Sequence, residues 1–201
     1  MIGRRAAPPR SLVMTKEEFL DRIRAESPAD LAWEFLVSKS ICLFADDRHY
    51  AEFRTRVSSH IPDVERVAVV GSGNWRYSLN PEKGFREFCS QSDVDVAVVS
   101  TARFHEFWEE MRMRHRKHYY ALTQYEKDRL RRNGENVYSG FISPVWIPNR
   151  DRRMNYEYHR ILNSLSDQSV GFLKVKMLFF RNDAEAVDYY ARGFWMAKKG
   201  I

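Results

Sequence analysis

The sequence predicts an α/β or α+β domain with a small sheet and several helices. Two short runs rich in β-branched residues, 64–70 and 93–99, have the composition of buried strands. A third apolar run, residues 173–180, has the same character. Segments with helical spacing lie before, between and after these runs, which is typical of a sheet covered by helices.

Length and composition set the domain organisation. The chain has 201 residues, 44% of them hydrophobic, which is enough for one domain with a buried core. We expect a flexible N-terminal arm over residues 1–14 and a single domain over residues 15–201. The arm has charge and proline but no apolar run long enough for a signal peptide or a membrane span.

Charge and cysteine content indicate which kinds of partner and which cellular compartment to expect. The formal net charge of +6 favours partners that carry phosphate, such as nucleotides or nucleic acid, and is equally compatible with simple solubility. Cys42 and Cys89 lie far apart and outside any CxxC motif, which argues against a zinc site and a disulfide scaffold. We therefore expect a cytoplasmic protein that has no membrane contact.

Local signals define the helices of the N-terminal part. Thr15 and Glu18 form a capping box, which predicts a helix over residues 16–25. A second helix begins at Pro28, because proline fits the first helical turn. A third is expected over residues 48–58.

Similar signals define the remaining helices. Aromatic residues at helical spacing predict a helix over residues 102–118. A second capping box at Thr123 opens a helix that we expect to end near Asn133-Gly134, followed by a loop up to Pro148. Two further helices are expected, over residues 152–165 and after Asn182.

The first predicted strand stops at Gly71-Ser72-Gly73. Glycine at a strand end lets the backbone approach a phosphate, because no Cβ stands in the way. The amides and the Ser72 hydroxyl of this turn can then donate hydrogen bonds to anionic oxygens.

Two aspartates open the second predicted strand. Asp93 and Asp95 are two residues apart, so both carboxylates project from the same face. Such a pair suits Mg²⁺ or Mn²⁺ beside a triphosphate, because these ions take hard oxygen ligands. A purely structural alternative has Asp93 capping the strand and Asp95 pairing with an arginine.

A strand that ends in Gly71-Ser72, followed by SDVDVAVV with both acids at its start, resembles the signature of the DNA polymerase β-like nucleotidyltransferase superfamily. The resemblance covers about the middle of the chain. It implies a small mixed sheet flanked by helices, a bound nucleoside triphosphate, and two Mg²⁺ (or Mn²⁺) ions. Asp93 and Asp95 would be the catalytic, metal-binding carboxylates.

The segment between Gly73 and Asp93 is longer than in compact members of that superfamily. We expect it to form a lid with base-stacking and phosphate-binding groups, in which Gly73, Asn74 and Arg76 extend the nucleotide site. The alternative is a simple insertion. The other aromatic and basic residues of the segment are Trp75, Tyr77, Lys83 and Arg86.

The third carboxylate that this superfamily usually supplies from a later strand is not apparent. The strand predicted over residues 173–180 has Lys174 and Lys176 at the corresponding positions. A lysine facing the two aspartates would weaken metal binding and would contact the nucleotide instead. Alternatively, the strand register differs and another acid supplies the ligand. The candidates are Asp167, Asp183 and Glu185.

The densest basic and aromatic cluster lies in the helix over residues 102–118 and just after it. Arginine and lysine side chains there can follow a phosphate backbone while aromatic rings stack on bases. A solvated helix face is the alternative. The predicted nucleic-acid contacts are Arg112, Arg114, Arg116 and Lys117.

Two functions follow from these motifs. One is an enzyme that transfers a nucleotidyl group from a nucleoside triphosphate to RNA, a protein or a small molecule. The other is a catalytically inactive module that binds nucleotide or RNA within a larger assembly, such as a toxin-antitoxin or phage-defence system. A third acid near Asp95 favours the first function, and a lysine there favours the second. A metal-dependent glycosyltransferase could also use the two aspartates, but that function leaves the Gly-Ser strand end unexplained.

Overall fold

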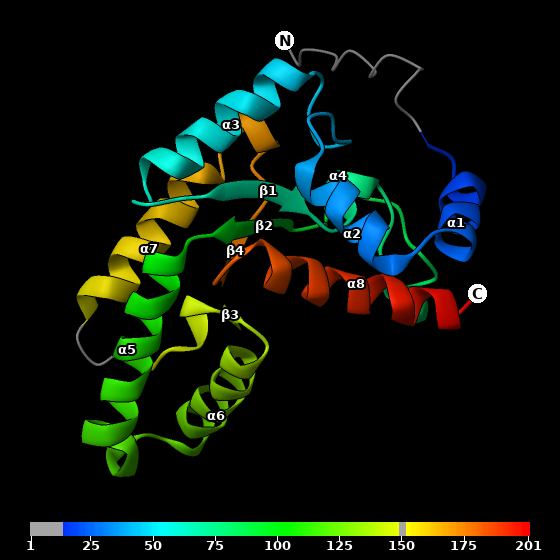
Figure 1. Cartoon of the computed structure of the whole chain (residues 1–201). Helices are drawn as coiled ribbons and strands as arrows, with labels where there is room; N and C mark the ends of the chain where they lie inside the picture. Colours follow the sequence, from blue (N-terminus) through cyan, green and yellow to red (C-terminus); the bar gives the residue numbers. More distant parts are fainter. Residues whose placement is uncertain (1–13, 149–151) are drawn as a thin grey trace.

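The computed structural model describes residues 14–148 and 152–201, and it shows helices on both faces of a four-stranded sheet (Figure 1). The mixed α and β architecture that the sequence predicts is therefore confirmed. The predicted N-terminal arm lies outside the described residues except for Met14. The strands are β1 (Arg66–Val70), β2 (Val94–Val99), β3 (Phe141–Ile142) and β4 (Val175–Phe180). The helices are α1 (Lys16–Ala25), α2 (Pro28–Val37), α3 (Asp47–Ser59), α4 (Ser72–Trp75), α5 (Thr101–His118), α6 (Gln124–Tyr138), α7 (Arg152–Leu165) and α8 (Asp183–Lys199).

The sheet is mixed, with strand order β1-β2-β4-β3. β1 and β3 run antiparallel to their neighbours, whereas β2 and β4 are parallel. The register sets Val70, at the end of β1, opposite Asp95 of β2, and sets Asp95 opposite Lys176 of β4. These three strands therefore bring the Gly-Ser turn, the aspartate pair and one of the two lysines to one end of the sheet.

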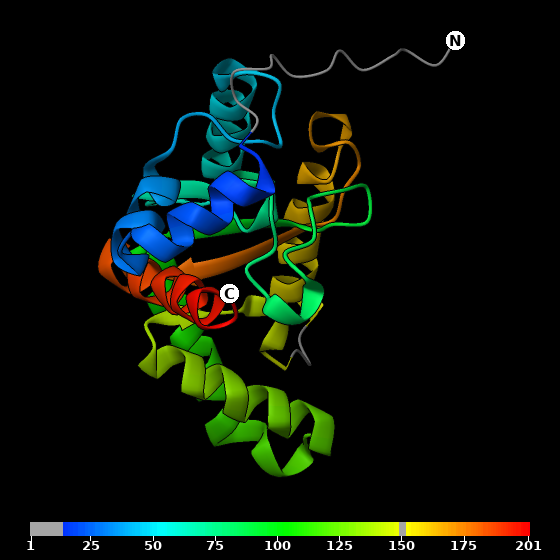
Figure 2. The ribbon, with the colours of Figure 1, turned by 90° about the vertical axis from the view of Figure 1, so that its right-hand side faces the viewer.

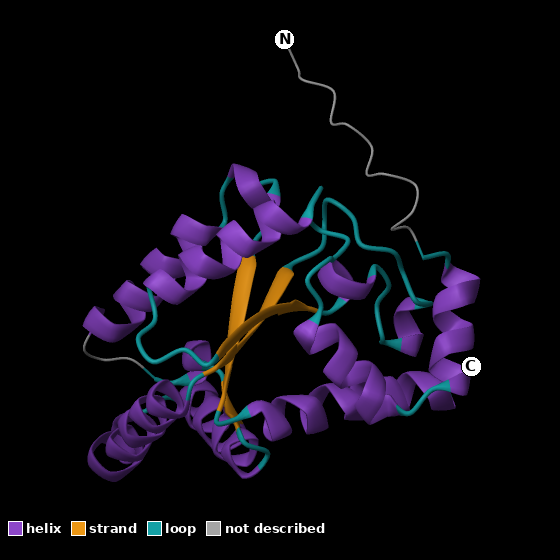
Figure 3. Ribbon diagram, turned by 45° about the horizontal axis from the view of Figure 1, so that its top comes forward, coloured by secondary structure: helices purple, strands orange, loops and turns teal. Residues whose placement is uncertain are grey.

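Each strand contributes alternate residues to two separate apolar cores, one on each face of the sheet. One core is formed with α3, α5 and α7 and includes Val69, Val96 and Met177. The other is formed with α1, α2 and α8 and includes Val70 and Ala97. Figure 3 shows the strands enclosed between these helical layers. Asp95 lies on the α8 face, because it is two residues from Ala97.

Most predicted helix limits agree with the structure within one or two residues, and the Thr15 and Thr123 capping boxes are both present. The predicted end near Gly134 is wrong, because α6 continues to Tyr138. Asn133 is fully buried in α6, and its side-chain amide bonds the backbone amide and carbonyl of Ser143 at 3.0 and 3.1 Å. This contact fixes the second half of the helix, so tertiary structure outweighs the low helix propensity of glycine.

Strand β3 lies in the segment that the sequence predicts as a loop. It has two residues, which pair with Phe179 and Phe180 of β4. Two residues are too few to give a strand periodicity. α5 and α6 lie side by side at one end of the molecule, beyond this short strand (Figure 2). None of the helices in the described ranges is long and apolar enough to cross a bilayer.

Candidate functional site

The two predicted aspartates and one predicted lysine form a charged cluster on the α8 face of the sheet. The Lys176 ammonium donates a short hydrogen bond to the Asp93 carboxylate and forms an ion pair with it. Lys176 is also the register partner of Asp95 on the neighbouring strand. The structural alternative, in which Asp95 pairs with an arginine, finds no support among the described ion pairs. The cluster therefore contains two carboxylates and one cation.

Asp95 has an unusual electrostatic environment. Solvent reaches its side chain, but the surrounding protein atoms remove enough hydration for burial to raise the pKa of the carboxyl. The negative charge of Asp93 acts in the same direction, whereas Lys176 and Lys83 oppose it. The net effect is a pKa above the usual aspartate value, which means that the surroundings destabilise the ionised carboxylate. A cation bound near Asp95 would stabilise this ionised form.

A cavity of about 550 Å³ opens beside Asp95. This volume is in the range of small-ligand sites. Residues of β1, β2 and β4 line one side, among them Lys176, together with Gly71 just after β1 and Lys174 just before β4. Aromatic residues line other parts of the wall, so the cavity combines cations, one carboxylate and flat apolar surfaces. The aromatic lining residues are Trp146, Tyr158, Tyr189 and Tyr190.

Gly71 makes the turn between β1 and α4 in a conformation that requires glycine. Its φ of 65° and ψ of −158° lie in a region that side-chain-bearing residues almost never occupy. A Cβ on Gly71 would also lie 3.2 Å from Oδ2 of Asp95. The backbone of this turn is thus packed directly against the aspartate. Among the described residues, the amides of Ser72 and Gly73 meet no protein acceptor, as expected for the first turn of a helix.

The Gly-Ser turn is held from behind by Asn74 and Cys42. Asn74 is 5% exposed, and its side-chain amide donates to the carbonyls of Phe35 and Val69 at 2.8 Å each. The Cys42 thiol contacts the carbonyls of Ser72 and Gly73 at 3.2 Å, and burial raises its pKa to about 12. Asn74 therefore positions the turn from the protein interior. The sequence predicts that Asn74 contacts the nucleotide, but its side-chain amide hydrogens are already bonded to backbone carbonyls.

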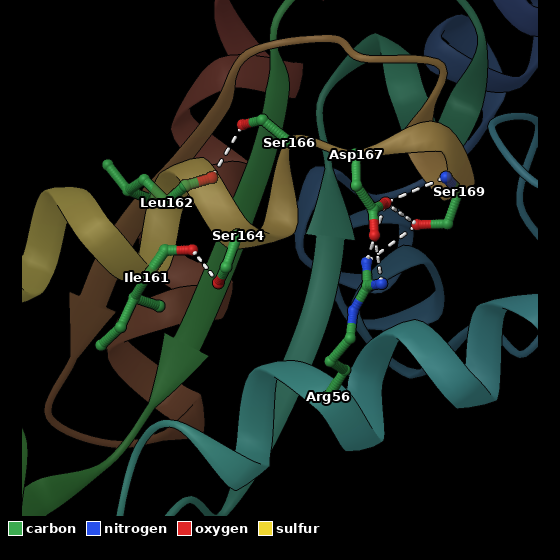
Figure 4. A network of polar contacts seen from close by, with 7 residues as sticks. All are labelled: Arg56, Ile161, Leu162, Ser164, Ser166, Asp167 and Ser169. Atoms are coloured by element: carbon green, nitrogen blue, oxygen red, sulfur yellow. Dashed lines mark hydrogen bonds and ion pairs between the residues drawn. The ribbon is translucent and has the colours of Figure 1, made fainter.

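None of the three predicted alternative acids joins the aspartates. Asp167 is bonded to Arg56 at 2.5 Å and caps a turn through Ser169, as Figure 4 shows. The alternative in which one of these acids supplies the third ligand finds no support, because each forms an ion pair with an arginine. The other two pairs are Asp183 with Arg66 and Glu185 with Arg181.

The charged cluster does not fit a two-metal site. Within residues 14–148 and 152–201, no group of three or more acidic, histidine or cysteine side chains is arranged to hold a metal ion. Lys176 stands opposite Asp95 on the neighbouring strand and forms an ion pair with Asp93. Asp95 is left as the carboxylate that can contact a divalent ion, provided that ligand oxygens and water complete the shell.

The predicted base-stacking lid is not formed. Trp75 is 3% and Tyr77 is 6% exposed, and both rings pack in the α1–α2–α8 core. Arg76 pairs with Glu87 at 2.5 Å and lines a separate, shallow depression. Lys83 is the member of the segment whose charge reaches Asp95. The segment is thus mainly a folded insertion.

The predicted nucleic-acid surface on α5 is also reduced. Arg114 is 6% exposed and bonds Glu110 at 2.6 Å, so it faces the interior. Arg112 pairs with Glu109 at 2.5 Å and lies over the Trp108 ring. Arg116 and Lys117 remain on the surface near the end of the helix.

Sequence reasoning missed the aromatic part of the site. Tyr189 and Tyr190 lie on α8 beside Asp95, whose charge raises the pKa of both hydroxyls in addition to the larger effect of burial. Trp146 follows β3, in the segment predicted as a loop. The aromatic richness of both segments was visible, but only the tertiary fold brings them to the cavity.

The chain matches no protein-family model, no curated protein and no solved structure.

The pKa values of Asp95 and Asp167 are shifted in opposite directions, so the two residues should affect stability differently as the pH changes. The pKa of Asp95 is raised, so its contribution to stability is present below the usual pKa of about 4 and is lost as pH rises through the folded-state pKa. For Asp167, burial raises the pKa, but hydrogen bonds from Arg56 and Ser169 lower it more. Its contribution is present at neutral pH and is lost as pH falls through the folded-state pKa.

We therefore expect Asp95→Asn to raise the Tm at pH 7 by about 2 °C and Asp167→Asn to lower it by a similar amount. The Asp95 difference should shrink as the pH falls toward 4, whereas the Asp167 difference should persist to pH 4 and shrink only at lower pH. Thermal unfolding followed by circular dichroism between about pH 2 and pH 8 measures both differences. A fall in Tm for Asp95→Asn at pH 7 would contradict the raised pKa.

Proposed function

We propose that this protein is a nucleotidyltransferase-like module that binds a nucleoside triphosphate and transfers its nucleotidyl group slowly or not at all. The observation that carries the proposal is Lys176, which stands opposite Asp95 and pairs with Asp93. The resemblance of the Gly-Ser and Asp-x-Asp motifs to the polymerase β-like superfamily supports nucleotide as the ligand. The lysine supports binding without efficient transfer.

The residues around the cavity suit a polyphosphate. Unpaired amides at Ser72 and Gly73 can donate to phosphate oxygens, and Gly71 keeps the backbone accessible. Lys174 and Lys176 line the cavity and Lys83 lies close enough to influence Asp95, so three cations can neutralise phosphate charge. The aromatic wall provides flat surfaces for a base.

Efficient transfer needs more than these groups. Both the attacking and the leaving oxygen gain negative charge during nucleotidyl transfer, and a two-metal site stabilises both. Here Asp93 is neutralised by Lys176, and among the described residues no third acid joins Asp93 and Asp95 in a group that could hold a metal ion. A single Mg²⁺ (or Mn²⁺) that arrives with the triphosphate can contact Asp95, but an ion at the attacking oxygen has no carboxylate to hold it.

Nucleotide binding and transfer can be measured separately. We expect Mg²⁺ with ATP, GTP, CTP or UTP to raise the Tm of the wild-type protein, and the rise to be smaller with EDTA. Asp95→Ala should remove the Mg²⁺-dependent part, whereas Asp188→Ala, a surface acid of α8 paired with Arg192, should keep it. Failure of every triphosphate to raise the Tm would refute nucleotide binding.

Transfer is tested with α-labelled triphosphates. We expect no stable label on the protein, RNA or small hydroxyl acceptors during prolonged incubation with Mg²⁺ or Mn²⁺. Rapid labelling that Asp93→Ala abolishes would show that two aspartates are sufficient, and the protein would then be an active nucleotidyltransferase.

A further inference from the structure

A second hollow lies next to the Asp95 cavity, along helix α6. It has a volume of about 400 Å³ and is lined by Tyr125 and Pro148, among others. Arg129, Val145 and Trp146 line both this hollow and the Asp95 cavity. The two spaces are therefore adjacent, with these three residues between them, so a ligand longer than one nucleotide can reach both by passing over Arg129 and Trp146.

The α6 side of this path is a stripe of aromatic and cationic groups. Tyr125, Arg129 and Arg132 are spaced i, i+4 and i+7, so they lie along one face of the helix. The Arg129 guanidinium lies 4.8 Å from the Tyr125 ring centre, and that of Arg132 lies 5.5 Å from the Trp146 ring centre. Each arginine thus lies beside a flat ring, an arrangement suited to stacking a base.

The arginines of this stripe differ from those of α5 in their ion pairing. In the described part of the chain, neither Arg129 nor Arg132 forms an ion pair, in contrast to Arg112 and Arg114 of α5. Glu126 is the acidic residue among those lining the second hollow, and its carboxylate is bonded to Thr123 at 2.8 Å in the capping box. The charges of Glu126 and Arg129 in the lining cancel formally, so the positive charge near the hollow comes from Arg132 beside Trp146 and from the lysines of the adjoining Asp95 cavity, Lys174 and Lys176.

We propose that a single-stranded nucleic acid binds along this α6 groove, defined by Tyr125, Arg129, Arg132 and Trp146, with its terminal nucleotide in the Asp95 cavity. The terminal part of this proposal depends on the nucleotide site proposed above. Guanidinium groups neutralise the phosphate backbone, and the rings of Tyr125 and Trp146 stack on successive bases. A protein partner with acidic side chains would use the charge of the groove but not its rings.

Tyr125 gives the most selective test, because it lines the second hollow and not the Asp95 cavity. It is 66% exposed, so its removal should leave the fold intact. We expect Tyr125→Ala to weaken binding of fluorescein-labelled eight-residue RNA and DNA strands by about tenfold, measured by fluorescence anisotropy. Arg129→Ala should weaken binding by a similar factor and reduce the slope of log affinity against log salt by about 0.7.

Two variants on the same helix serve as controls. Tyr138 is an exposed tyrosine at the other end of α6, and Arg131 is an exposed arginine paired with Asp128. Tyr138→Ala and Arg131→Ala should each change strand affinity less than twofold. Equal losses for Tyr138→Ala and Tyr125→Ala would show that the groove does not determine binding.

The outcomes separate this proposal from the proposed nucleotide site. Retained ATP stabilisation in Tyr125→Ala, together with weaker strand binding, supports the groove. Unchanged strand binding in Tyr125→Ala, or no strand binding at 50 mM salt, refutes the groove and leaves ATP binding as the separate test of the nucleotide site. If poly-glutamate displaced the labelled strand as well as an unlabelled strand does, the nucleic-acid proposal would be refuted in favour of an acidic protein partner. Affinities measured separately for the RNA and the DNA strand show which of the two the groove binds more tightly.

Discussion

Lys176→Asp is expected to create a three-carboxylate metal site of a kind that the described residues of the wild-type protein do not contain. The side chain at this position stands opposite Asp95, and the wild-type lysine is bonded to Asp93. The substitution replaces a cation by a carboxylate and releases Asp93, so three carboxylates would meet on two neighbouring strands. Because the charge near the ion changes by two units, we expect Mn²⁺ affinity to rise by about 100-fold.

Titration of Mn²⁺ followed by electron paramagnetic resonance measures this gain directly. Lys176→Asn removes the positive charge without adding an acid and should give an intermediate affinity. Lys174→Asp places a new acid just before β4, where it is not the register partner of Asp95 and leaves the Lys176–Asp93 ion pair in place, and should give a smaller gain. A folded Lys176→Asp protein that binds Mn²⁺ no better than the Lys174→Asp control would show that position 176 does not control metal binding.

The same variant links the metal site to catalysis. If the lysine is what separates this chain from a transferring enzyme, the Lys176→Asp protein should transfer label from α-labelled triphosphates when Mn²⁺ is present. Asp93→Ala in that background should remove the transfer. Metal binding without transfer would place the missing element elsewhere, for example in how the acceptor is positioned.

The strand motifs of this site could be predicted from the sequence because their signals are local. Gly71-Ser72 ends a β-branched run, and Asp93 and Asp95 alternate with buried valines, so their common face follows from strand geometry. The exposed face of β4 that carries Lys176 could also be predicted, because β4 has the same alternation.

The remaining parts of the site depend on tertiary packing. The pairing of Lys176 with Asp93 requires the parallel register between β2 and β4, which sequence patterns do not specify. The sequence predicts that the segment containing Trp75 forms an exposed lid, but Trp75 is buried against α2 and α8. Tyr190 belongs to a helix predicted only by its cap and aromatic spacing, and nothing local directs it toward Asp95. Aromatic residues without their partners therefore gave the least reliable predictions.

Gly71→Ala is expected to damage both the fold and the nucleotide site, because two independent features require glycine there. The backbone conformation of Gly71 costs other residues about 1–3 kcal/mol, and the added methyl group would crowd Asp95 at 3.2 Å. We expect a loss of about 2 kcal/mol in the free energy of unfolding, a fall in Tm of about 6 °C, and no stabilisation by nucleotide.

A second glycine gives a matched control for this substitution. Gly134 lies inside α6 without a positive φ, and a Cβ placed there meets no atom within 4 Å. Gly134→Ala should therefore stabilise the protein by about 1 kcal/mol, since alanine is the better helix former, and nucleotide stabilisation should be unchanged. Urea unfolding and nucleotide-dependent thermal shifts on both variants measure these effects. Opposite signs of the stability change are the decisive result: if Gly71→Ala were as well tolerated as Gly134→Ala and still bound nucleotide, the Gly-Ser turn would not be the phosphate-binding element of this protein.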